Sequence, residues 1–258
     1  MATTRKIAVI IPCYNEAKGI GSVIDKMPHK RAKRNHWEIE VIVVDNNSTD
    51  NTTEVAKKHG ATVIHEPKKG KGNAIRTGFA SVPADTDYVV MLDGDDTYDA
   101  GEVLRMVEPL YNDFCKVVIG SRLSGKIAAH SMSFTSRLGN WFFTHIVRIA
   151  HNVAVTDVLT GYFAWKKEVL DELSPHLKSH GFAIEMEMIT RMARMGYDIY
   201  SVPISYTPRA GESNLQPFSD GAKILKMFAK TLRWQPHNRK KMTITESNNK
   251  VLSESTEA

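Results

Sequence analysis

Short apolar runs rich in β-branched residues alternate with stretches of helical periodicity, and this alternation constrains the fold more than any other feature of the chain. Strands that are apolar on both faces and joined through helices predict a parallel sheet covered on both sides. We therefore expect the α/β class, with a Rossmann-like, mostly parallel sheet and helices on both of its faces. The predicted strands are residues 7–11, 41–44, 62–64, 88–92 and 117–119, and the predicted helices are residues 20–32, 52–59, 73–81 and 102–111.

The second half of the chain has a looser rhythm. We expect a loop at 121–130, a helix at 136–150, a strand near 162–165, helices near 167–173 and 184–195, a strand at 199–202 and an amphipathic segment at 220–234. Residues 237–258 are polar, which predicts a disordered tail. Because 258 residues with 42% hydrophobic content can bury one large core, we expect a single domain over residues 1–236.

Composition and charge narrow the class of function. The formal net charge is +5, but the basic residues cluster at 29–34, 68–76 and 223–241 without interleaved aromatics, so we expect no nucleic-acid partner. The charge instead favours anionic phosphates or an anionic membrane surface. The two cysteines predict no structural disulfide and a reducing compartment. We expect neither a secretory leader nor a spanning helix, which requires about 18 or more apolar residues.

Three polar clusters each follow one of the predicted strands. Parallel strands end at the same sheet edge, so the clusters should converge there. Carboxylates as close together as Asp93 and Asp95 repel each other unless a cation neutralises them, and Mg²⁺ or Mn²⁺ prefers such oxygen ligands. The pattern predicts a site for a metal and a nucleoside diphosphate, although each cluster alone also fits a loop or a helix cap. The clusters are Pro12-Cys13-Tyr14-Asn15-Glu16, Asp45-Asn46-Asn47-Ser48-Thr49-Asp50 and Asp93-Gly94-Asp95-Asp96.

The order of these clusters, followed by Gly120-Ser121-Arg122, resembles the inverting family 2 glycosyltransferases of GT-A fold. Within that family it is most similar to the branch of dolichol-phosphate mannose synthase and related polyprenyl-phosphate sugar synthases. The segments 69–78, 157–164, 182–187 and 203–215 resemble further motifs of the same enzymes. The resemblance implies a GT-A fold with a nucleotide-binding half at 5–120 and an acceptor-binding half at 121–220. With a lipid acceptor, the apolar residues and lysines of 220–235 also allow an interfacial helix, and an ordinary core helix is the alternative.

The resemblance also implies roles for individual residues. Nucleotide-sugar binding falls to Pro12, Tyr14, Glu16, Asp45, Lys71, Asp93, Gly94 and Asp95, and metal binding to Asp93 and Asp95, with Asp96 and Thr97 as weaker candidates. Catalysis falls to Asp95, Arg122, Glu185 and Arg209, and binding of the acceptor phosphate to Arg122, Arg137 and Ser213. For Arg137 the alternative is a solvated helix face or a membrane-facing charge. Glu187 is the alternative to Glu185, and either acid could instead pair with Arg191 or Arg194. The family commonly has lysine where this chain has Asn214.

The implied reaction moves a hexose or N-acetylhexosamine from a UDP- or GDP-linked sugar to a polyprenyl or dolichyl phosphate, with Mg²⁺ or Mn²⁺. A phosphate monoester has a second pKa of about 6 and is itself a nucleophile at neutral pH, so no Ser/His/Asp arrangement is needed. The implied location is cytoplasmic, peripheral on the cytoplasmic face of a membrane. A small membrane subunit or a homo-oligomer remains open, as do a soluble or glycan acceptor and a non-catalytic binding subunit.

Overall fold

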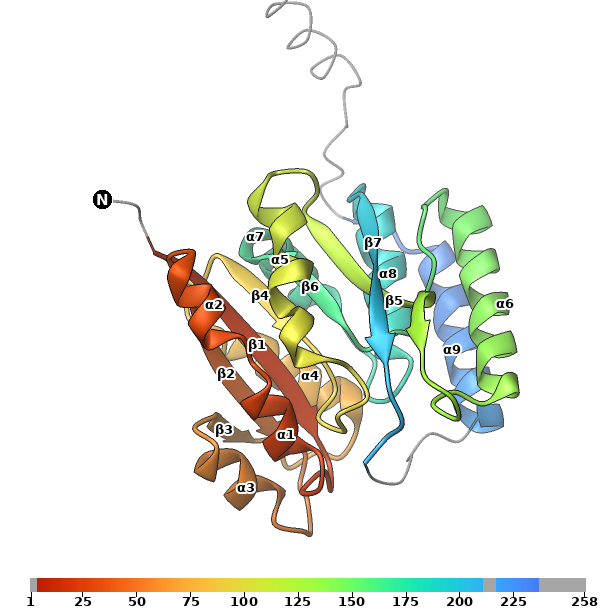
Figure 1. Cartoon of the computed structure of the whole chain (residues 1–258). Coiled ribbons are helices and arrows are strands. Elements are labelled where there is room, and N and C mark those ends of the chain that lie inside the picture. Colours follow the sequence, from red (N-terminus) through yellow and green to blue (C-terminus); the bar gives the residue numbers. More distant parts are fainter. Residues whose placement is uncertain (1–3, 211–216, 237–258) are drawn as a thin grey trace, which may run out of the picture.

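The computed structural model describes residues 4–210 and 217–236 and places them around one twisted sheet (Figure 1). The predicted tail at 237–258 lies outside the described residues. Seven strands of the described part form the sheet in the order β3-β2-β1-β4-β6-β5-β7. The strands are β1 (Arg5–Cys13), β2 (Trp37–Asp45), β3 (Thr62–His65), β4 (Tyr88–Met91), β5 (Val117–Ile127), β6 (Phe163–Lys166) and β7 (Ile199–Tyr206).

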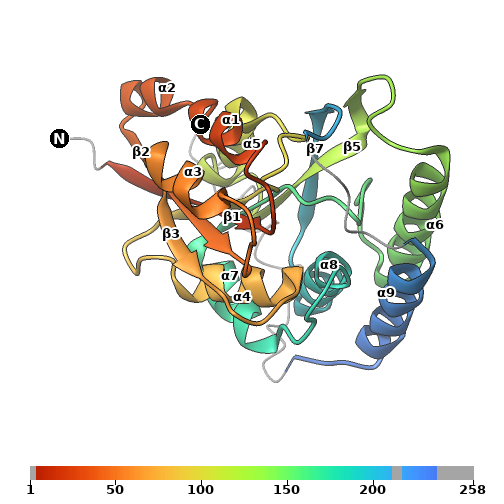
Figure 2. The same cartoon turned by 90° about the horizontal axis from the view of Figure 1, so that it is seen from below.

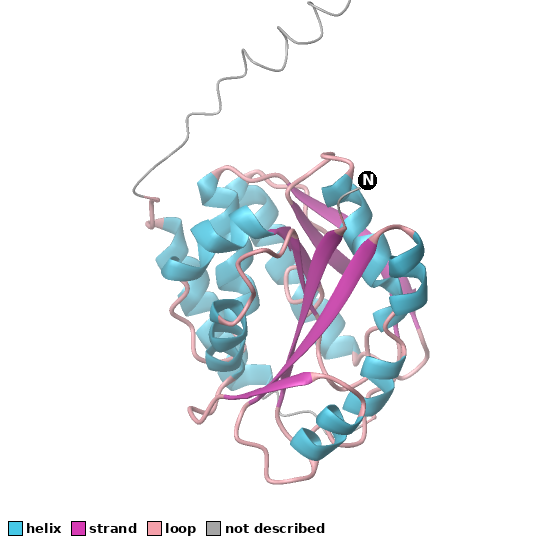
Figure 3. Ribbon diagram, turned by 90° about the vertical axis from the view of Figure 1, so that its left-hand side faces the viewer, coloured by secondary structure: helices cyan, strands magenta, loops and turns pink. Residues whose placement is uncertain are grey.

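Helices cover both faces of the sheet, as the sequence predicts (Figures 2 and 3). They are α1 (Ile20–Asp25), α2 (His29–Arg34), α3 (Thr52–Lys58), α4 (Lys71–Ala80), α5 (Val103–Tyr111), α6 (Phe134–His151), α7 (Lys167–Leu173), α8 (Ile184–Met195) and α9 (Pro217–Leu232), with 3-10 turns η1 (Ala100–Glu102) and η2 (Ser174–His176). None of the helices in the described ranges is both long and apolar enough to cross a membrane.

Alternation along the strands divides the core into two layers. In β1, Val9 and Ile11 pack with α1, α2, α3 and α5 on one face. Ala8 and Ile10 pack on the other face, with α4 and with residues of α6 to α9. Successive side chains of a strand point to opposite faces, so a continuous apolar run such as that of β1 can support two cores.

The register of the central strands brings their ends together. β1 runs parallel to β2 and to β4, with Cys13 opposite Asp45 and Ile10 opposite Met91. The segments after these strands therefore leave the sheet at the same edge. β6 is antiparallel to both β4 and β5, which makes the sheet mostly rather than wholly parallel.

Two predictions of local structure were wrong. The helix expected at 20–32 is divided into α1 and α2, and Pro28, which has no backbone N–H, directly precedes α2. The loop expected from residue 121 is instead the continuation of β5 beside β7, with an irregular register between Ser121 and Lys126. A Cβ on Gly125 would lie 2.0 Å from the carbonyl oxygen of Ile204, so this pairing requires glycine.

Candidate active site

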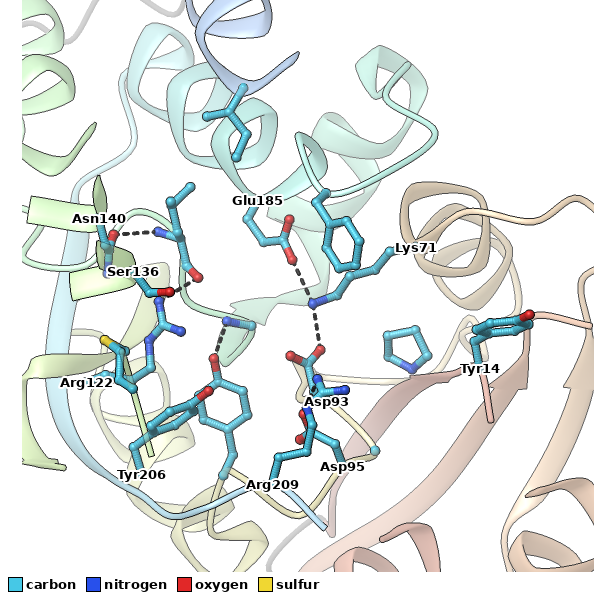
Figure 4. Close-up of a pocket in the computed structure, with 18 of the residues that line it drawn as sticks. Tyr14, Lys71, Asp93, Asp95, Arg122, Ser136, Asn140, Glu185, Tyr206 and Arg209 are labelled. Atoms are coloured by element: carbon cyan, nitrogen blue, oxygen red, sulfur yellow. Dashed lines mark hydrogen bonds and ion pairs between the residues drawn. The ribbon is translucent and has the colours of Figure 1, made fainter. Parts of the chain in front are cut away.

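A cavity of about 640 Å³ opens where β1 and β4 end (Figure 4). It gathers side chains that are far apart in the sequence, from the tips of both strands, the start of α4, the α8 helix and the segment after β7. Ten predicted site residues line it: Pro12, Tyr14, Glu16, Lys71, Asp93, Gly94, Asp95, Arg122, Glu185 and Arg209. The predicted convergence is thus present for the first and third polar clusters, and Asn46 of the second cluster also lines the cavity.

Lys71 connects the tip of β4 with α8. Its Nζ lies 2.7 Å from Asp93 Oδ1 and 2.7 Å from Glu185 Oε1. Burial alone would lower the pKa of Lys71, but the two carboxylates together raise it above its usual value. Burial raises the pKa of Glu185, and Lys71 opposes that shift. One buried cation therefore serves two acids that approach it from different elements.

The backbone around Lys71 is docked tightly on the loop before α8. A Cβ on Gly70 would lie 2.2 Å from His180 O, and one on Gly72 would lie 2.2 Å from Ser179 O. Gly70 also has φ 133°, a conformation that side chains other than that of glycine rarely adopt. The Gly72 N–H donates to His180 O at 2.9 Å. The two glycines thus fix Lys71 at the start of α4 against the segment that leads into α8.

Arg209 connects the tips of β1 and β4. It forms ion pairs with Asp95 and with Glu16, whose Oε1 lies 3.3 Å from Arg209 Nη1. Asp95 is 1% exposed and its Oδ1 accepts hydrogen bonds from the Thr97 hydroxyl at 2.7 Å and the Thr97 N–H at 3.1 Å. Burial and the neighbouring Asp93 raise the pKa of Asp95, while burial raises the pKa of Glu16 to about 7 against the effect of Arg209.

Glycines bring the tip of β4 close to its neighbours. A Cβ on Gly94 would lie 2.4 Å from Cys13 Sγ, and one on Gly161 would lie 2.5 Å from Asp93 Oδ2. Asp96, which follows Asp95 in the chain, has φ 62°. Its carboxylate accepts hydrogen bonds from Lys26 Nζ at 2.7 Å and from Ser22 Oγ at 2.8 Å. Asp96 thus contacts α1 and its flank, while Asp93 and Asp95 line the cavity.

Arg122 lines the cavity and forms a buried ion pair with Asp157. Its Nε and Nη2 donate to the two carboxylate oxygens of Asp157 at 2.8 and 2.9 Å, and Nη2 also donates to Leu159 O at 2.6 Å. Asn140 Nδ2 donates to Asp157 Oδ1 at 2.6 Å, and the Tyr206 ring lies 5.3 Å from the guanidinium carbon. Burial would lower the pKa of Arg122, but Asp157 raises it well above its usual value. The sequence motif contains Asp157 but does not show this pairing.

Several predicted residues lie elsewhere. Asp45 is buried but does not line the cavity, because its Oδ2 lies 3.2 Å from His65 Nδ1 and its Oδ1 accepts from the Ser48 N–H. Arg137 is exposed on α6 and also lies outside the cavity wall. Ser213 lies outside the described residues. The roles assigned to these three residues stay predictions.

Glu187, the alternative to Glu185, has a structural environment. It pairs with Arg191 at 2.7 Å and accepts a hydrogen bond from the Ser179 N–H. The pair that the sequence left open for either acid is therefore made by Glu187, one helical turn before Arg191. Glu185 itself faces the cavity.

Asn46 and Tyr98 are among the lining residues to which the sequence analysis gave no role of their own. Asn46 Oδ1 accepts from the Gly70 N–H at 2.7 Å and its Nδ2 donates to Lys68 O at 2.8 Å, so it holds the loop before Lys71. Its place directly after Asp45 was a usable signal. The buried Tyr98 hydroxyl accepts from the Gly161 N–H at 2.7 Å. No sequence spacing indicates that contact.

The acids of the cavity suit a divalent ion that a substrate helps to hold. Among the described residues no group of three or more His, Cys, Asp or Glu side chains has the arrangement of a metal site. Asp93 and Asp95 supply two carboxylates, and Mg²⁺ is typically bound by one or two carboxylates together with substrate phosphates and water. Burial and, after it, the neighbouring Asp93 raise the pKa of Asp95, and a cation held by these carboxylates would oppose both effects.

Comparison with known proteins agrees with this geometry. The family model described as "Glycosyl transferase family 2" matches residues 8–174. A Haloferax volcanii protein named dolichyl-phosphate hexose transferase is 37% identical over 227 residues, which cover 87% of this chain and 92% of that protein. Glycosyltransferase AglJ of the same organism is 34% identical over 226 residues, covering 87% of this chain and 71% of the relative.

A solved structure shows the same fold. Glucosyl-3-phosphoglycerate synthase from Mycobacterium tuberculosis, crystallised with Mn²⁺, uridine diphosphate and phosphoglyceric acid, aligns with a TM-score of 0.69 at 24% identity, over 89% of this chain and 79% of that one. The expected GT-A fold is thereby confirmed. The strand order, the polar strand tips and the family match agree: the chain is a glycosyltransferase and belongs to glycosyl transferase family 2.

Proposed function

We propose that this glycosyltransferase moves a hexose or N-acetylhexosamine from a nucleoside-diphosphate sugar to a polyprenyl phosphate, with inversion and with Mg²⁺ or Mn²⁺. The observation that carries the proposal is the pair Asp93 and Asp95 on one cavity wall, with Lys71 and Arg209 directly beside them. The relative named dolichyl-phosphate hexose transferase supports the sugar and the lipid acceptor. Solved relatives crystallised with uridine diphosphate and Mn²⁺ or Mg²⁺ support the donor and the metal.

The donor is assigned to the half formed by residues 5–120. The Tyr14 ring offers area for a base, and Lys69 fixes this ring through a hydrogen bond of 3.0 Å to its hydroxyl. Asp93 and Asp95 would hold the divalent ion, which neutralises negative charge on a bound diphosphate. Lys71 and Arg209 add positive charge at the place where the leaving diphosphate gains charge. UDP and GDP both remain candidates.

The acceptor is assigned to the half formed by residues 121–220. An acceptor phosphate oxygen attacks the anomeric carbon, a new carbon–oxygen bond forms, and the bond to the diphosphate breaks on the opposite face of the sugar. Arg122 is proposed to bind the acceptor phosphate and Glu185 to accept a hydrogen bond from a sugar hydroxyl. The dianionic phosphate needs no general base, so the absence of one from the proposed mechanism follows from the acceptor's chemistry.

The test is transfer of label from radioactive UDP- or GDP-sugars to polyprenyl phosphate in the presence of Mg²⁺ or Mn²⁺. We expect lipid-extractable label with the wild type and none with Asp95→Asn. Asp96→Asn is the matched control, because Asp96 contacts Lys26 and Ser22 instead of the cavity and asparagine tolerates its positive φ. Absence of label with every donor contradicts the proposal.

A soluble acceptor is the second candidate, and one observation favours it. Ile224 and Phe228 of α9, the helix expected at a membrane interface, are buried in the core. We propose the lipid acceptor first, with the protein peripheral on the cytoplasmic face of a membrane. Equal turnover with a water-soluble phosphate acceptor and with polyprenyl phosphate would favour the soluble one. A small membrane subunit or a second copy as partner stays a prediction.

A further inference from the structure

The outer surface of α6 carries large apolar side chains that do not enter the core. We call these five residues the α6 stripe: Phe134, Leu138, Trp141, Phe142 and Ile149, which are between 49% and 84% exposed. Apart from the adjacent Trp141 and Phe142, successive positions are three, four or seven residues apart, and all five share one side of the 18-residue helix. Asn140, Thr144 and Val147 are buried on the side that faces the fold. The helix is thus anchored through one face and presents a second apolar face outward.

The α9 helix lies beside α6 on the same side of the molecule (Figures 1 and 2). It is anchored by Ile224 and Phe228, while Leu225 and Leu232 are exposed. Among the described side chains of α9, these two leucines therefore add a narrow apolar border to the larger α6 stripe. Most of the exposed large apolar side chains described on these two helices belong to α6, not to α9, the helix for which the sequence predicted a membrane interface.

Positive charge borders this surface, and acids are nearly missing from it. The α6 helix contains no Asp or Glu, and the one acid of α9, Asp220, is buried and lies 2.9 Å from Lys223 Nζ. Exposed cations lie on both helices and directly after α9: Arg137, Arg148, Lys223, Lys226, Lys230 and Arg233. Aromatic residues with adjacent lysines and arginines are the combination that binds the headgroup region of an anionic bilayer.

We propose that the α6 stripe and the cations beside it form a docking surface for an anionic lipid bilayer. The proposal rests on the lipid-phosphate acceptor of the proposed function. A second copy of the chain is a poorer occupant, because two-fold pairing would bring identical cations together with few acids to form ion pairs with them. The phosphates of a bilayer supply the missing negative charge, and its hydrocarbon covers the exposed rings.

The same two helices also form part of the cavity wall. Ser133, which caps α6, Ser136 and Asn140 within α6, and Ile224 of α9 line the cavity that holds Asp93 and Arg122. A bilayer seated on the α6 stripe would therefore lie next to the acceptor side of the active site. A polyprenyl chain could stay in the hydrocarbon while its phosphate enters the cavity.

The experiment is co-sedimentation of the full chain with vesicles of phosphatidylcholine containing phosphatidylglycerol, compared with vesicles of phosphatidylcholine alone. We expect binding to the anionic vesicles that weakens with salt. The double variant Trp141→Glu/Phe142→Glu should lower the partition coefficient at least about tenfold. Phe114→Glu is the matched control, because Phe114 is 69% exposed and belongs to the segment before β5, in neither of the two helices. Thermal unfolding should show that both variants are folded.

Three results would overturn the docking surface. The wild type could stay in the supernatant with anionic vesicles, or the double variant could bind as well as the wild type. The wild type could also be a dimer by light scattering and the double variant a monomer, which would make the surface a self-interface. Turnover with a short, water-soluble polyprenyl phosphate separates the two proposals. The double variant should retain turnover with this soluble acceptor, because that acceptor needs no membrane. A wild type that shows no turnover with any acceptor contradicts the proposed function, not the docking surface.

Discussion

Replacing Lys71 by methionine tests the charge balance of the site most directly. The change removes a side chain that is 15% exposed and lies 2.7 Å from both Asp93 and Glu185, and it leaves the half-buried Asp93 and the buried Glu185 without their cation. Removing one preorganised group that stabilises developing charge typically costs about 10²–10³ in rate. We expect a loss of that size in the single-turnover rate of sugar transfer at saturating donor and acceptor.

Stability should change with a defined dependence on pH. Burial already raises the pKa of Glu185, and loss of Lys71 removes the opposing effect, so the folded-state pKa rises further. A raised folded pKa gives stability that is present below the unfolded pKa and lost as pH rises through the folded one. The deficit of Lys71→Met in unfolding free energy should therefore be smallest in acid, below about pH 4, and grow toward neutral pH.

The assays are single-turnover transfer and urea unfolding across this pH range. The control is Lys26→Met, which removes a cation 2.7 Å from Asp96, a residue that does not line the cavity. We expect that control to retain its transfer rate. A wild-type rate in Lys71→Met, or a stability deficit that is the same at every pH, would refute the reasoning.

Three more predictions follow from single contacts. Asp157→Asn leaves Arg122 buried without its counter-ion and should cost about 3–5 kcal/mol of stability, measured by urea unfolding. It should also raise KM for the acceptor more than KM for the donor. An unchanged KM for the acceptor argues against a role of Arg122 in acceptor binding. Gly161→Ala, whose Cβ would lie 2.5 Å from Asp93 Oδ2, should weaken the Mn²⁺-dependent thermal shift caused by UDP, whereas Gly181→Ala, which meets open space, should not. Burial raises the pKa of Glu16 to about 7, so the wild type should lose stability as pH rises through that value, and Glu16→Gln should remove this loss; identical pH profiles of the two proteins contradict it.

The sequence predicted the elements whose signals are local. Apolar periodicity identified the strands β1, β2 and β4, and a polar segment comes directly after each of them. Because parallel strands end at the same edge of a sheet, these segments could be placed together there. The pairing direction of β6 and the extension of β5 to Ile127 depend on contacts with distant strands. The split between α1 and α2 was readable in principle, because Pro28 stands between them.

Side-chain partners were harder to predict than positions. Lys71, Asp93 and Glu185 were each expected near the site, but their mutual contacts depend on how α4 and α8 pack. Tyr98 gave no signal, because its hydrogen bond to Gly161 crosses 63 positions of the chain. Charge and residue type indicate which groups can do chemistry, whereas packing decides which of them meet.

The contact of Gly70 and Gly72 with the carbonyls of His180 and Ser179 has a mechanical consequence. Because no side chain separates these backbones, the start of α4 and the entry to α8 form one rigid unit. Any shift of the segment before α8 would carry Lys71 with it and change its distance from Asp93. Contact between a sugar and Glu185 would thus be transmitted to the carboxylate at the end of β4, and a substitution at either glycine would uncouple the two sides of the cleft.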